Sequence, residues 1–234
     1  MDNRPKGEPM PLIEHPVLLK VLDDLADLAQ LVKVAMATAT RALLTADVQL
    51  AEQVITEDLQ IDLANNNIEA VCLDVLESNS LNRSEVRAAV ACLRMSTTLE
   101  RMGDLAAHVA KQARLRYPFV SVPPALQPTF QRMGELADVV VASTAEVIAA
   151  KDLARAMEIT EADREMDEIH RELFGAVLDP GWADGVQAAI DVTLLSRYYE
   201  RFADHGVTIA RRIAFVVTGE PYGITDLGSA ADSE

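Results

Sequence analysis

The chain has 234 residues, half of them hydrophobic, which is enough to bury the core of one large domain or of two small ones. Aromatic residues make up only 4%, and the prevalence of Ala, Leu and Val favours packed helices over a β-sandwich or barrel. The net charge of −16 argues against nonspecific nucleic-acid binding and against docking on anionic lipid, because both need a basic surface. These totals predict a soluble all-α protein that meets a basic partner or binds cations.

The first half of the chain predicts three helices. Residues 1–16 hold four prolines and are expected to form a flexible lead-in. Apolar residues such as Leu18, Leu22 and Leu25 then recur at spacings of three and four, which predicts an amphipathic helix from residue 17 to about 45. Asp47 is the expected N-cap of a second helix that ends near residues 77–82. Ser84 or Asn82 is expected to cap a third helix that runs to about residue 116, so residues 17–117 form one predicted three-helix bundle.

The second half repeats this plan. Three prolines within residues 117–124 cannot continue a helix, so residues 118–124 are predicted to be a linker. Helices are expected over 125–150, from an Asp152 cap to about 178, and over 183–217. They make a second predicted three-helix bundle over 125–217, and residues 218–234 are expected to form a disordered tail.

Two pairs of segments show that the halves are copies. "VITEDLQID" (54–62) matches "EITEADREMD" (158–167), with a constant offset of 105 residues. "LERMGDLAAHVAKQ" (99–112) matches "YERFADHGVTIARR" (199–212), with an offset of 100 residues. Because the offset changes only at a turn, the pattern predicts a duplicated domain. The expected fold is two tandem, pseudo-symmetric three-helix bundles built from six long antiparallel helices.

Acidic pairs at a spacing of four occur at matching positions in both copies. They are Asp58/Asp62, Glu100/Asp104, Asp163/Asp167 and Glu200/Asp204. This spacing places both carboxylates on one helix face, where repulsion costs about 0.2–0.5 kcal/mol per pair unless a cation intervenes. Carboxylate clusters suit hard cations such as Mg, Mn or Ca, and also iron.

A solvated acidic surface is the alternative interpretation. A chain this acidic would contain about six such pairs by chance, since the spacing itself is not selective. Arg101, Arg164 and Arg201 lie close by in the sequence and could neutralise the carboxylates. Both interpretations remain open at this stage.

Other residues add little chemistry. His170 follows Asp167 by three, as in di-iron bundles, but its repeat partner is Asn65, so this motif is not duplicated. Cys72 and Cys92 form no CxxC motif and are expected to be buried free thiols. The sequence contains no catalytic motif and no glycine-rich phosphate cradle, so we expect no enzymatic activity and no direct phosphate binding. It contains neither a segment resembling a signal peptide nor an apolar span, which predicts a cytoplasmic protein.

The two "ER" segments resemble the E-R-x-x-D-x-x-x-N-I-A signature of the PhoU family of phosphate-signalling regulators, and "VITEDLQID" and "ITEADREMD" resemble its second repeated stretch. The resemblance implies tandem three-helix bundles, a homodimer, and a metal or iron cluster (Fe, Zn, Mn or Mg) on the eight carboxylates named above. The signature departs at His108 and Thr208, where Asn is usual, and at Ala203, where the first copy keeps Gly103.

The function implied by the resemblance is that of a cytosolic adaptor. Such a protein would couple a phosphate-specific ABC transporter to a sensor histidine kinase and would hold down the phosphate-starvation response. The alternative is a metal-binding helical bundle without a signalling role, which would serve either as a metal store or as a carboxylate-bridged di-metal enzyme.

Overall fold

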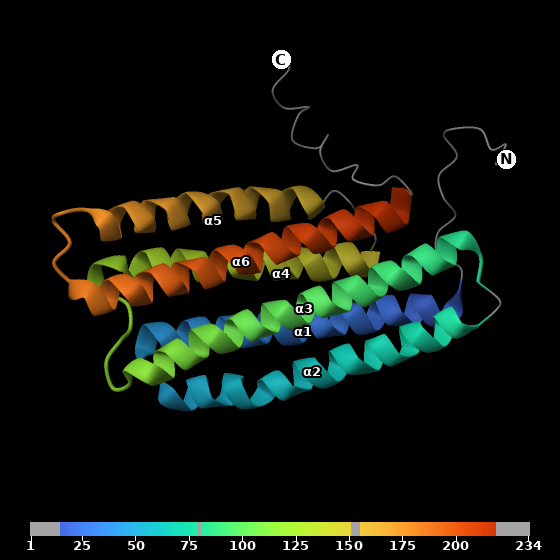
Figure 1. Cartoon of the computed structure of the whole chain (residues 1–234), viewed down its shortest axis with the longest axis horizontal. Helices are drawn as coiled ribbons and strands as arrows, with labels where there is room; N and C mark the ends of the chain where they lie inside the picture. Colours follow the sequence, from blue (N-terminus) through green and yellow to red (C-terminus); the bar gives the residue numbers. More distant parts are fainter. Residues whose placement is uncertain (1–14, 79–80, 151–154, 219–234) are drawn as a thin grey trace, which may run out of the picture.

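The computed structural model describes residues 15–78, 81–150 and 155–218, and within these ranges it contains six α-helices and no β-strand (Figure 1). The elements are α1 (Pro16–Thr45), α2 (Val48–Glu77), α3 (Arg83–Arg116), the 3₁₀ turn η1 (Pro124–Leu126), α4 (Gln127–Ala150), α5 (Arg155–Leu178) and α6 (Gly185–Thr218). The all-α prediction is therefore confirmed. Most of the predicted lead-in, the Asp152 cap and most of the predicted tail lie outside the described residues.

Two helix starts follow from side-chain capping. The Asp47 carboxylate accepts hydrogen bonds from the backbone N–H groups of Gln49 and Leu50, at 2.9 and 3.0 Å. Asn82, rather than Ser84, caps α3, and its side chain accepts from the N–H groups of Ser84 and Glu85. Glu85 accepts from the Asn82 N–H at 2.9 Å in return. Each cap satisfies backbone donors that have no partner within the helix.

Two other helices begin about two residues later than the sequence predicts. Prolines 123 and 124 lead into the η1 turn, and α4 follows at Gln127 with Pro128 in its first turn, where a missing N–H costs nothing. Gly185 has a φ angle of 83°, which is incompatible with a right-handed helix, so α6 starts at this residue rather than at 183.

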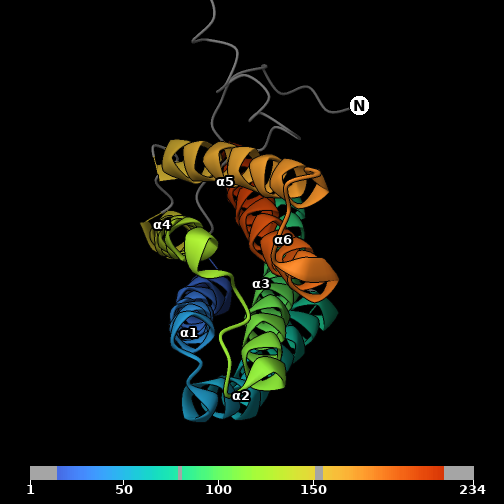
Figure 2. The same cartoon turned by 90° about the vertical axis from the view of Figure 1, so that its left-hand side faces the viewer.

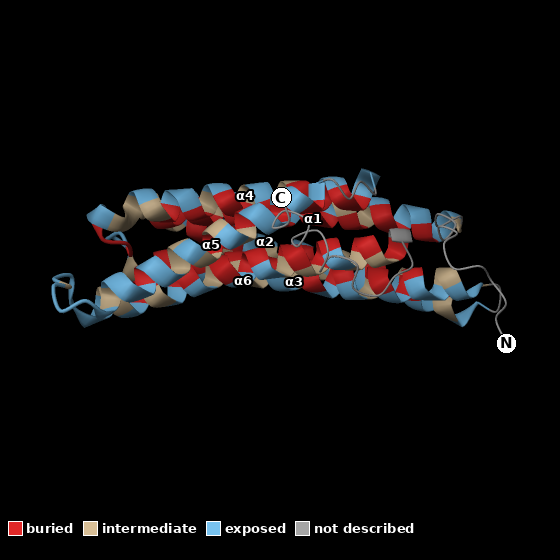
Figure 3. Ribbon diagram, turned by 90° about the horizontal axis from the view of Figure 1, so that it is seen from above, coloured by how far each residue is buried: buried red, intermediate tan, exposed pale blue. Residues whose placement is uncertain are grey.

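The six helices share one core. α2 packs on α1 and α3, α5 packs on α4 and α6, and the halves meet where α1 contacts α4 and α3 contacts α6 (Figures 1 and 2). The main hydrophobic cluster takes buried residues from every helix, among them Leu25, Ile61, Met102, Val140, Met166 and Phe202. Buried and exposed residues alternate along the helices, with the buried ones turned inward (Figure 3). The apolar periodicity of the sequence therefore serves one main core, and a smaller buried cluster that includes Leu18, Ala91 and Val216 lies apart from it.

The antiparallel packing of α3 against α6 forms a seam, and a buried carboxylate closes one end of it. Asp191 of α6 is only 2% exposed and accepts bonds from Arg116 Nε at 2.6 Å and Arg116 Nη2 at 2.8 Å. Gln112 Nε2 of α3 donates to it at 2.6 Å, and Gln187 Nε2 donates at 3.2 Å. We call these four residues the Asp191 cluster. A buried charge needs such a set of partners, so the cluster ties the two halves together in one register.

Close approaches elsewhere depend on small or hydroxylated residues. A methyl group added at Gly206 of α6 would lie 2.3 Å from Val140 Cγ1 of α4, so only glycine allows this approach. Thr40 of α1 and Tyr199 of α6 share a buried hydrogen bond of 2.7 Å that spans the two halves. Cys72 and Cys92 are buried free thiols, as predicted, and burial raises their pKa values to about 11 and about 12.

Across the described helices, none combines the length and the apolar composition that crossing a bilayer requires.

Candidate functional site: two carboxylate clusters

The first-half carboxylates lie on the facing sides of α2 and α3. Gly103 allows the approach, because a methyl group there would lie 2.9 Å from Ile61 Cδ1 and 3.5 Å from Asp58 Oδ1. The Asp58 carboxylate therefore lies against the backbone of α3. Burial raises the pKa of Asp58, and the Asp104 and Asp62 carboxylates raise it further. The pKa of Glu100 is also raised, by burial first and by Asp104 next. The four carboxylates therefore interact electrostatically, and we call Asp58, Asp62, Glu100 and Asp104 the first-half cluster.

The second-half cluster is the repeat equivalent on α5 and α6, made of Asp163, Asp167, Glu200 and Asp204. Burial raises the pKa of Asp163 to about 7, with contributions from the three other carboxylates and a partial offset by Arg211. Asp163 Oδ1 and Glu200 Oε2 are buried, and no described residue forms a hydrogen bond with either. Buried oxygens without partners are costly, so this cluster is the more strained of the two.

Arginines neutralise the clusters only in part. Arg101 lies 3.6 Å from Glu100 and 3.3 Å from Asp104, and Arg197 pairs with Glu200. Arg164 instead pairs with Glu161 and Glu168, away from the second-half cluster. Arg197 was not among the arginines expected near the carboxylates, although its position three residues before Glu200 on a helix is typical of an ion pair.

The oxygen-only donor set suits a hard cation, and the two partnerless oxygens of the second half are groups that a cation would satisfy. As placed, however, no three His, Cys, Asp or Glu side chains in the described parts of the chain stand close enough together to hold a metal ion. The assignment of the eight carboxylates as metal ligands therefore stays a prediction.

The two residues that replace the signature Asn make the same hydrogen bond in both halves. His108 Nδ1 donates to the Asp104 carbonyl oxygen at 2.7 Å, and Thr208 Oγ1 donates to the Asp204 carbonyl oxygen at 3.0 Å. The His108 ring also packs beside Tyr198 of α6, with 5.3 Å between ring centroids. His108 therefore anchors α3 against α6 through its ring and its own helix through Nδ1.

A second repeated hydrogen bond accounts for His170. Ser96 of α3 donates to Asn65 of α2 at 2.6 Å, and Ser196 of α6 lies 2.9 Å from His170 Nδ1 of α5. These four residues are repeat equivalents, so His170 occupies the place of an amide that bridges two helices. Its position beside Asp167 follows from this bridge.

Comparison with known proteins agrees with this duplicated arrangement. A family model described as the PhoU domain matches residues 25–113 and again residues 130–213. The chain is 41% identical to "Phosphate-specific transport system accessory protein PhoU homolog 1" of Mycobacterium leprae, over 88% of this chain and 92% of that protein. It is 42% identical to "PhoU homolog 2" of Mycobacterium tuberculosis, over 88% of this chain and 96% of that protein. The crystal structure of PhoU from Pseudomonas aeruginosa matches with a TM-score of 0.78 and 25% identity, over 87% of this chain and 98% of that one.

Proposed function

Since the chain belongs to the PhoU family, we propose that it is a cytoplasmic adaptor that represses the phosphate-starvation response. In this proposal a homodimer couples a phosphate-specific ABC transporter to a sensor histidine kinase. The protein acts by binding and catalyses no reaction. The observation that carries the proposal is the match, over 88% of the chain, to relatives named as accessory proteins of a phosphate-specific transport system.

The physical features of the molecule support a binding role. Long helices that share one core present rigid surfaces, and a net charge of −16 favours association with basic patches. Charge complementarity of this kind raises the association rate and selects partners more than it raises affinity. Binding to the transporter ATPase and to the kinase is therefore expected to weaken as salt rises.

Deletion of the gene tests the regulatory role. We expect a phosphate-starvation reporter to become active at high phosphate and to be silenced again by the wild-type gene. A reporter that stays silent in the deletion strain would contradict the adaptor role. Pull-down of the ATPase and of the kinase sensor region at low salt tests the coupling, and absence of binding to both partners would count against it.

We also propose that the carboxylate clusters hold a divalent metal or an iron cluster, with Asp58, Asp62, Glu100 and Asp104 in the first half and Asp163, Asp167, Glu200 and Asp204 in the second. The partnerless oxygens of Asp163 and Glu200 support this proposal. Elemental analysis of protein purified without chelator tests it, together with the melting temperature before and after chelation. Wild type should contain metal and lose stability on chelation.

A matched pair of variants assigns the site. Glu200→Gln/Asp204→Asn should abolish the metal content of the second half, whereas Glu69→Gln/Asp74→Asn on the exposed face of α2 should leave it unchanged. Equal metal content in both variants would remove Glu200 and Asp204 from the site. Bound metal together with an unchanged reporter in the deletion strain would favour the alternative function, a metal-binding bundle without a signalling role.

A further inference from the structure

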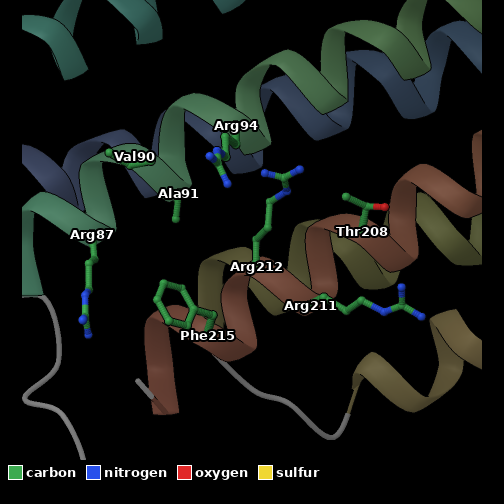
Figure 4. Close-up of a pocket in the computed structure, with 8 residues that line it drawn as sticks. All are labelled: Arg87, Val90, Ala91, Arg94, Thr208, Arg211, Arg212 and Phe215. Atoms are coloured by element: carbon green, nitrogen blue, oxygen red, sulfur yellow. The ribbon is translucent and has the colours of Figure 1, made fainter. Parts of the chain in front are cut away.

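A basic pocket lies between α3 and α6, at the opposite end of the seam from the Asp191 cluster (Figure 4). Its volume is about 380 Å³, within the range of small-molecule sites. Four arginines line it, Arg87 and Arg94 from α3 and Arg211 and Arg212 from α6, and none of its lining residues is acidic. A lining of four arginines with no acidic residue is unexpected on a protein with a net charge of −16.

Ion pairing sets two of the pocket arginines apart from Arg116 and Arg132. No described residue forms an ion pair with Arg87 or Arg94, whereas Arg116 and Arg132 bind carboxylates through forked contacts. Arg211 also acts on Asp163, whose raised pKa it partly offsets. Arg94 and Arg212 extend from facing helices toward the same part of the pocket (Figure 4). Like charges that converge across a groove repel one another, and an anion between them would reverse that repulsion.

The internal repeat identifies the residues that are equivalent to the pocket lining at the other end of the seam. At the 100-residue offset that relates Glu100 to Glu200, Asp191 corresponds to Ala91. Two donors to Asp191, Gln112 and Gln187, correspond to Arg212 and Arg87, both of which line the pocket. One end of the seam therefore holds a carboxylate of the chain itself, surrounded by amides. The other end has a methyl group in that position, within a pocket that four arginines line and in which Arg94 and Arg212 converge (Figure 4).

We propose that this pocket binds a phosphate-bearing small molecule, whose phosphate groups take the place at Ala91 that the Asp191 carboxylate takes at the other end. Guanidinium groups bind phosphate through paired, charge-assisted hydrogen bonds, and four of them suit more than one phosphate group. Phe215 and Val90 supply an apolar wall for the remainder of the ligand. The proposal is independent of the adaptor role. It departs from the expectation of no direct phosphate binding, which was drawn from the acidic faces and the lack of a glycine-rich cradle.

Calorimetric titration of the full chain with inorganic phosphate, tripolyphosphate and ATP tests the proposal at constant ionic strength, with sulfate as the control anion. We expect saturable binding of tripolyphosphate and ATP with one site per chain, and weaker binding of inorganic phosphate. Tighter binding of ATP than of tripolyphosphate would assign a role to Phe215, and equal binding would confine recognition to the phosphate groups. Absence of saturable binding by all three probes, or equal binding of sulfate, would overturn the proposal.

Two variants locate the site. Arg87→Gln/Arg94→Gln should weaken binding by at least about tenfold, because it removes two charge-assisted contacts from exposed side chains. The control Arg41→Gln/Arg171→Gln makes the same change in net charge on α1 and α5 and should bind as wild type does. Equal affinity in both double variants would overturn the assignment. Ala91→Asp supplies the missing carboxylate and should compete with the ligand, and circular dichroism will show whether it is folded.

Discussion

At the scale of single residues, Asp191 is the clearest case of a charge that the fold depends on. It is buried between α3 and α6, and Arg116 and Gln112 both direct donors at it. Asp191→Ala should lower the free energy of unfolding by about 2–3 kcal/mol, because it strands these donors at the seam. Urea denaturation at pH 7 measures this loss. Asp74→Ala, on the exposed face of α2, is the control and should change stability by less than about 0.5 kcal/mol.

Asp163 makes stability depend on pH. Its pKa is raised from 3.8 to about 7 in the folded protein, so folding favours the protonated carboxyl. In metal-free protein this contribution is complete below about pH 4 and is lost as the pH rises through about 7.

Asp163→Asn removes this pH dependence. The variant should match wild type near pH 4 and exceed it at pH 8, by up to about 2 kcal/mol once solvent screening of this partly exposed group is allowed for. Urea denaturation across this pH range, with chelator present, measures the difference. A constant difference between the two proteins at all pH values would contradict the assignment.

At the scale of helices, the contact between α4 and α6 depends on Gly206. Gly206→Ala should cost about 1–3 kcal/mol of stability, because the new methyl group would overlap Val140, a side chain with little rotamer freedom. Gly175→Ala on α5 is the matched control, since a methyl group there meets no atom within 4 Å. The control should be neutral or stabilising by up to about 1 kcal/mol. Thermal melts of both variants decide between steric overlap and a general effect of glycine replacement.

The helices themselves were predictable because their causes are local. The stripe of Leu18, Leu22 and Leu25 and the cap at Asp47 act within a few residues, and the structure has them as predicted. The start of α6 was less predictable, since nothing in the sequence states that Gly185 adopts a positive φ angle. The duplicated carboxylates could be assigned to pairs of neighbouring helices, because the repeat restricts which helices pack together.

The seam between the halves was not predictable in the same way. The α3 partners of Asp191 lie 75 and 79 residues away along the chain, and no spacing rule connects them to it. The residues that line the basic pocket come from two helices and lie more than a hundred positions apart in the sequence, and each arginine alone resembles an ordinary solvated residue. Only the register between α3 and α6 reveals these groups, and that register depends on long-range packing.

At the scale of the whole molecule, the shared core predicts that the two halves unfold together. α1 packs on α4 and α3 packs on α6, with one main cluster of buried residues drawn from all six helices. We expect a single calorimetric transition whose van't Hoff and calorimetric enthalpies agree. Two resolved transitions, one for each repeat, would show that the halves behave as separate domains.

The two ends of the α3–α6 seam differ in what fastens them, and this has a consequence for motion. The Asp191 cluster fastens one end through charge-assisted hydrogen bonds, while the end at Ala91 has four arginines and only a small buried cluster that includes Ala91 and Val216. The two helices should therefore separate more readily at the arginine end than at the Asp191 end. Amide hydrogen exchange should be faster around residues 87–94 and 208–215 than around residues 108–116. Tripolyphosphate should slow it only at the first two segments, so that a solute would set the stiffness of the molecule.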